Sequence, residues 1–138
     1  MKAICFDWRA EYSKFFGVVY RPIAEIEIRS KASEWIAIKP YVDSGADISL
    51  FPRSIGEVLL GLRIEDGKEH LLHGIGMQSI KSFVHDGIQM RLGHEAFEIR
   101  AAFAEVDAVP HLLGRMNIFD RFTITFDSHK HRTCFSKE

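Results

Sequence analysis

The chain has 138 residues, of which 46% are hydrophobic and 27% are charged, and its net charge is −1. This composition argues against an intrinsically disordered chain, and with a nearly balanced charge no field that attracts a polyanion such as nucleic acid is expected. The length fits one domain with one hydrophobic core.

The sequence has no stretch that approaches the roughly 18 apolar residues of a membrane-spanning helix. The first residues reach Asp7 before an apolar signal-type segment forms. Cys5 and Cys134 stand near opposite ends of the chain. In a chain without a signal, two such cysteines indicate reduced thiols, so we expect a cytoplasmic protein. From the missing apolar stretch and the balanced charge, we expect it to bind neither membrane nor nucleic acid.

The pattern divides the chain into an N-terminal extension (1–16), one domain (17–128) and a polar C-terminal tail (129–138) that frays. The extension has no clean period. From residue 17 to residue 30 apolar and polar residues alternate, with Ile26 and Ile28 on one side, which predicts a half-buried strand.

A second strand is predicted over residues 35–42, leading into the loop 43–49. Pro52 then begins a short helical segment that runs to about Leu60.

Short apolar segments separated by turn signals follow, and a second short helix is predicted over residues 116–120. The segments are 62–64, 71–72, 80–84, 88–92, 97–106 and 122–126. Asp86-Gly87, between two of them, is a hairpin signal. Turns every 8–12 residues predict an all-β barrel or sandwich with one or two short helices.

The loop that begins Asp43-Ser44-Gly45-Ala46-Asp47 carries the strongest chemical signal. Glycine permits backbone conformations and close approaches that a Cβ forbids, and the serine hydroxyl can bond locally or across an interface. Such a loop can hold a carboxylate where a substrate backbone approaches closely.

This loop resembles the Asp-Ser/Thr-Gly-Ala loop of retropepsin-like aspartic proteases. Two further landmarks of that family follow in the same order: the glycine-rich His73–Met77, where the family has a substrate-covering flap, and Leu112-Leu113-Gly114-Arg115. The resemblance covers about residues 20–127 and implies the acid-protease fold. Because only one Asp-Ser-Gly occurs, it also implies a homodimer that cleaves a peptide or protein substrate without a cofactor or metal.

The resemblance also implies a role for each matching residue. The catalytic group would be Asp43, Ser44 and Gly45, with Ser44 bonding across the two-fold axis. Asp47 would bind the substrate main chain and form a bidentate pair with Arg115 as structural support. The remaining substrate-binding positions would be Ala46, Ile48, Gly74, Ile75 and Gly76.

Other interpretations of these residues remain open. Asp43 can end its strand in a simple Asx-turn. A retropepsin-like module that binds peptides or dimerises without turnover, or an unrelated monomeric β-barrel, would also fit the pattern. The sequence does not fit a calcium-binding EF-hand loop that begins at Asp43, because its sixth position is Ile48, where an EF-hand needs glycine. Pairs of histidines such as His70 and His73 lack further ligands for a metal site.

Overall fold

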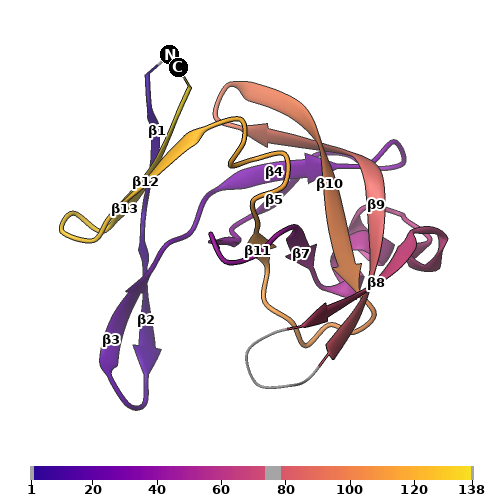
Figure 1. Cartoon of the computed structure of the whole chain (residues 1–138), viewed down its shortest axis with the longest axis horizontal. Coiled ribbons are helices and arrows are strands. Elements are labelled where there is room, and N and C mark those ends of the chain that lie inside the picture. The colour runs from indigo at the N-terminus through magenta and orange to yellow at the C-terminus, as the bar shows by residue number, and fades with distance from the viewer. Residues whose placement is uncertain (1, 74–78, 138) are drawn as a thin grey trace.

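The computed structural model describes residues 2–73 and 79–137. Most of this part of the chain consists of strands and their connections (Figure 1). The strands are β1 (Ile4–Asp7), β2 (Arg9–Ser13), β3 (Gly17–Arg21), β4 (Ile26–Arg29), β5 (Ile36–Ile38), β6 (Tyr41–Val42), β7 (Ser49–Phe51), β8 (Lys68–His73), β9 (Ser79–Leu92), β10 (Glu95–Ala104), β11 (Leu112–Leu113), β12 (Thr123–Asp127) and β13 (Arg132–Ser136). Two short helices are the π-helix η1 (Ile55–Leu59) and the 3-10 helix η2 (Ile64–Asp66). The predicted all-β class with short helices is confirmed.

The main sheet has eight strands in the order β5-β4-β9-β10-β7-β11-β6, with β8 paired to β9. The sheet curls around its own core (Figure 1). An isolated bridge between Ile23 and Tyr41 ties the last strand, β6, back to the segment before β4. This curled sheet agrees with the retropepsin-like architecture predicted from the sequence.

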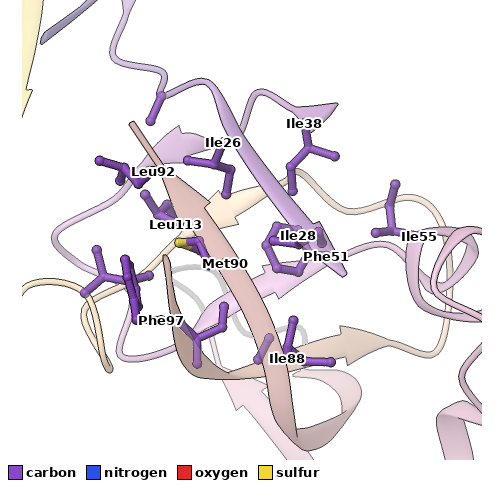
Figure 2. Close-up of a cluster of buried hydrophobic side chains, with 14 of the residues drawn as sticks. Ile26, Ile28, Ile38, Phe51, Ile55, Ile88, Met90, Leu92, Phe97 and Leu113 are labelled. Atoms are coloured by element: carbon purple, nitrogen blue, oxygen red, sulfur yellow. The ribbon is translucent and has the colours of Figure 1, made fainter. Parts of the chain in front are cut away.

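The core lies inside the curl, where strands from both halves of the chain contribute side chains (Figure 2). Ile26 and Ile28 are 2% and 0% exposed, so the predicted inward face of this segment is confirmed. Other members of the cluster include Ile38, Phe51, Ile55, Ile88, Met90, Leu92, Phe97 and Leu113. Burial of this apolar area is the main stabilising contribution to the fold.

The two ends of the chain form a separate three-stranded sheet in the order β1-β13-β12. The prediction of a frayed tail is wrong, because β13 is the central strand of this sheet. Thr133 and Phe135 are fully buried, and their neighbours alternate with them toward solvent. The polar composition of residues 129–138 concealed a period-2 strand pattern. The expected N-terminal extension likewise contains β1 and β2.

Cys5 and Cys134 form a disulfide, so the prediction of reduced thiols is wrong. The register of β1 and β13 places the two residues directly opposite each other, with 4.1 Å between their Cα atoms. Their separation of 129 residues concealed this proximity. The expected cytoplasmic location rested on reduced thiols, which the disulfide replaces, and it stays a prediction. Among the described residues, no helix has the length and apolar character to cross a membrane.

Several predicted boundaries are also wrong. Asp86-Gly87 lies inside the long strand β9, where Gly87 has φ +75° and the pairing with β10 shifts register near Ile99. The dipeptide therefore makes an irregularity within the ladder, and the chain reverses after Leu92 instead.

Residues 116–120 form successive turns, not a regular helix, and Asn117 has φ 68°. The segment 62–64 forms no strand, because Ile64 begins η2. The strand predicted over residues 17–30 is interrupted between β3 and β4.

Candidate active site

The loop after β6 is positioned by β11, a strand from the far end of the chain. β11 lies between β6 and β7, parallel to the first and antiparallel to the second. At the end of β6, the backbone N–H of Asp43 donates to the carbonyl of Leu113 at 2.9 Å. Two of the sequence landmarks, about 70 residues apart, therefore meet in space.

Gly114 allows the two backbones to approach closely. A Cβ at this position would lie 2.4 Å from the carbonyl carbon of Ile48 and 2.5 Å from its oxygen. The N–H of Gly114 donates to the hydroxyl of Ser49 at 3.0 Å, and Ser49 is fully buried. The glycine and this hydroxyl together set the distance between β11 and the loop. Sequence reasoning considered Ser49 only as a helix cap or calcium ligand and did not find this hydrogen bond, because its partner lies 65 residues away.

Arg115 supports the loop from outside. One guanidinium nitrogen donates to the carbonyl oxygen of Ser44 at 2.8 Å, and another contacts a carboxyl oxygen of Asp47. The expected ion pair between Asp47 and Arg115 is present. Its geometry differs from the prediction, since the guanidinium bridges a backbone carbonyl and a carboxylate and does not hold the carboxylate with two bonds.

The carboxyl group of Asp43 has a local hydrogen bond. Its Oδ1 accepts the N–H of Gly45 at 2.9 Å, and the backbone carbonyl of Asp43 accepts the N–H of Ala46 at 3.2 Å. Asp43 is partly buried, whereas Ser44 and Gly45 are exposed. The local bond is that of an Asx-turn. It engages one of the two carboxyl oxygens and fixes the orientation of the group.

A surface depression of about 470 Å³ adjoins Asp43. Its walls come from β2, β3, β6 and β11, and its lining residues are Glu11, Arg21, Pro22, Tyr41, Val42, Asp43, Pro110 and Leu112. Sequence reasoning did not place Glu11 or Arg21 at the site, because Glu11 belongs to the expected N-terminal extension and Arg21 to a predicted strand without a site signal.

Glu11 organises the charged wall of this depression. Its carboxylate accepts the hydroxyl of Tyr41 at 2.8 Å and pairs with Arg9 at 2.9 Å and Arg21 at 3.2 Å. Burial alone raises the pKa of Glu11, but the hydrogen bonds from Tyr41 and Arg9 and the two positive charges outweigh it and leave the pKa lowered. Glu11 is therefore ionised at neutral pH.

His111 lies one residue before β11, and its carbonyl accepts the N–H of Tyr41 at 2.9 Å. Burial lowers the pKa of the His111 imidazole, and the positive charge of Arg9 lowers it further. The side chain is neutral at neutral pH and adds no charge beside β6.

Of the other predicted substrate-binding residues, Ile48 is buried and three lie outside the part of the chain that the structure describes. Ile48 is 7% exposed and packs in a small second cluster with Leu50, Ala102 and Val109. Gly74, Ile75 and Gly76 of the predicted flap lie outside the described residues. The strands on either side of them, β8 and β9, pair as an antiparallel hairpin from Lys68 to His73.

In the described ranges 2–73 and 79–137, no group of three or more His, Cys, Asp or Glu side chains is arranged to hold a metal ion. Around Asp43 the structure offers a carboxylate, backbone amides and the ion cluster of Glu11.

Comparison with known proteins identifies no family for this chain. No family model matches the chain, and no curated protein matches it. Among solved structures, the chain is similar to the EIAV protease complexed with the inhibitor HBY-793. The two are 22% identical, the match covers 69% of this chain and 82% of that one, and the TM-score is 0.48. A similarity at this level assigns neither family nor activity to this chain.

Proposed function

We propose that this chain is one half of an aspartic endopeptidase, with a catalytic pair formed by Asp43 of two identical subunits. The observation that carries the proposal is the position of Asp43. It ends a strand on a tight loop that Leu113, Gly114 and Arg115 hold from the opposite end of the domain. Such support keeps a carboxylate in a fixed orientation beside a depression.

The single carboxylate explains why a second copy is needed. Two carboxyl groups brought together across a two-fold axis cannot both ionise readily, so they share one proton. The ionised member takes a proton from water, and the water oxygen attacks the peptide carbonyl carbon. The protonated member stabilises the oxygen that becomes negative. Return of a proton to the amide nitrogen lets the C–N bond break. The pair would titrate as a unit with two apparent pKa values.

The remaining loop residues have supporting parts in this proposal. Ser44 is exposed, so its hydroxyl can bond across the axis, and the carbonyl of Gly45 can accept a hydrogen bond from an extended substrate. The side chain of Asp47 is 82% exposed even though it contacts Arg115, so it remains accessible to a substrate N–H. Such main-chain contacts suit an extended peptide.

The test is the Asp43→Asn variant, assayed with a mixture of peptides from pH 4 to pH 7 and mass spectrometry of the products. We expect the parent to cleave and the variant to show no cleavage, while its dimer and unfolding temperature stay unchanged. Asp120→Asn is the matched control, because Asp120 is an exposed acid outside the loop. Equal cleavage by parent and Asp43→Asn would refute the catalytic assignment.

A second candidate is a peptide-binding or dimerisation module without turnover. The bond from Gly45 to Asp43 favours it, since an Asx-turn gives the carboxylate a local structural use. This module would bind peptides in the same assay and release no product at any pH.

A further inference from the structure

The hairpin formed by β2 and β3 has no strand partner in the described part of the chain. It makes a two-stranded sheet of its own and projects from the rest of the molecule (Figure 1). Its register places Tyr12 opposite Val18 and Ala10 opposite Tyr20. Because side chains alternate along a strand, these four lie on the same face. All four are exposed.

The tip of the hairpin is strongly apolar. Phe15 is 87% exposed and Phe16 74%, and Tyr12 and Val18 on the adjoining face are 78% and 62% exposed. A two-stranded hairpin is marginally stable in water by itself, and contiguous exposed apolar groups mark a surface that binds a partner. This hairpin therefore has the properties of an arm whose apolar side another molecule covers.

The base of the hairpin is held in a fixed direction. The ring of Tyr20 stacks on His131 with 4.0 Å between centroids, and Trp8 stacks on the same imidazole at 5.8 Å. On the other side, Glu11 accepts the hydroxyl of Tyr41, two residues before Asp43. The hairpin is thus anchored both to the terminal sheet and to the strand that carries the candidate catalytic residue.

Position and charge indicate what covers the hairpin. Its base borders the depression at Asp43, so a second copy that brings its own Asp43 to this edge comes close to the hairpin. The hairpin carries Arg9, Lys14 and Arg21 against the single acid Glu11, whereas the whole chain has a net charge of −1. The rest of the chain is therefore acidic, which attracts the hairpin of another copy.

We propose that hairpin 9–21 is an arm that clasps a second copy of this chain, with Phe15 and Phe16 as its apolar anchors. The inference rests on the proposed function, from which it takes the second copy. It adds a contact surface that the sequence landmarks do not contain. Aromatic anchors of this kind carry a large share of the binding free energy at interfaces.

The test compares two double variants of the full chain by sedimentation velocity over a concentration series. The first is Phe15→Ser with Phe16→Ser. The matched control is Val58→Ser with Leu59→Ser, since these residues are also exposed, at 73% and 47%, and belong to η1 and not to the hairpin. We expect the tip variant to dimerise about 100-fold more weakly and the control to behave like the parent. Unchanged circular dichroism of both variants establishes that they are folded.

Two results would overturn the inference. The first is a tip variant that dimerises as tightly as the parent. The second is a monomeric parent that binds vesicles of phosphatidylcholine and phosphatidylserine through the two phenylalanines, which would make the tip a membrane anchor.

Peptide cleavage measured on the same samples separates this inference from the proposed function. If the arm is right and the protease assignment is wrong, the tip variant loses its dimer although the parent cleaves nothing. If the protease assignment is right and the arm is wrong, the tip variant keeps both dimer and cleavage.

Discussion

The closest backbone approach in the candidate site gives a sharp prediction for Gly114→Ala. The added methyl group would meet the carbonyl group of Ile48 at 2.4–2.5 Å and the backbone nitrogen of Ser49 at 2.9 Å. These backbone atoms lie at the start of β7 and directly before it, so they cannot rotate away as the end of a side chain can. One of the two strands, β7 or β11, must shift.

The magnitude follows from three contributions. Overpacking of a well-packed site destabilises by about 1–3 kcal/mol. Loss of the hydrogen bond from Gly114 to Ser49 adds about 1 kcal/mol. The lower backbone entropy of alanine in the unfolded chain returns roughly 0.4–1 kcal/mol. The net effect is a loss of about 1–3.5 kcal/mol in the free energy of unfolding, or roughly 3–11 °C in Tm for a chain of this size.

The assay is thermal unfolding followed by circular dichroism, with Gly45→Ala as control. At Gly45 the nearest atom to an added Cβ is Oδ1 of Asp43 at 3.2 Å, which belongs to a side chain and can move. We expect this control to unfold within about 1 kcal/mol of the parent. A Gly114→Ala variant that unfolds within roughly 2 °C of the parent would show that the close approach does not require glycine.

Three further predictions follow from the contacts of the site and the chain ends. Arg115→Lys keeps the charge but cannot bridge Ser44 and Asp47, so we expect kcat/KM to fall at least about tenfold. The free energy of unfolding measured in urea should change by less than about 1 kcal/mol, because the side chains of Arg115 and Asp47 are largely exposed. A large loss of stability with unchanged cleavage would contradict this prediction. Replacing Cys5 and Cys134 by serine removes a cross-link between the chain ends and should lower the free energy of unfolding by about 2–5 kcal/mol. Dithiothreitol should cause the same loss in the parent protein and no additional loss in the serine variant. Because the pKa of Glu11 lies below its ordinary value of 4.5, its ion cluster stabilises the protein above that pH and the contribution disappears as the pH falls through the lowered pKa. Glu11→Gln should therefore reduce the difference in Tm between pH 7 and pH 3, by an amount that corresponds to less than about 1 kcal/mol since the group is near the surface; an unchanged difference would count against the cluster.

Local patterns predicted the parts of this protein that depend on neighbouring residues. The alternation around Ile26 and Ile28 identified the inward face of β4, because one side of a half-buried strand meets the core. The ion pair between Asp47 and Arg115, 68 residues apart, was implied by the family resemblance and not by a local pattern. The all-β class followed from the spacing of turns.

The errors have a common cause in long-range pairing. Asp86-Gly87 is a hairpin signal by itself, but the ladder with β10 continues through it and makes it an irregularity in β9. The polar tail became the central strand β13 only because β1 and β12 flank it. Pairing of the two chain ends also brought Cys5 opposite Cys134, which no local property of either cysteine reveals.

The sequence by itself determined which carboxylate lies on a tight glycine loop and which glycine and arginine accompany it. Only the tertiary structure decided how those parts meet: through Ser49 and the missing Cβ of Gly114, and beside an N-terminal hairpin that supplies Glu11 and Arg21. The physical reason is that hydrogen-bond register and close packing join residues 30 to 129 positions apart, whereas composition and periodicity describe only the local chain.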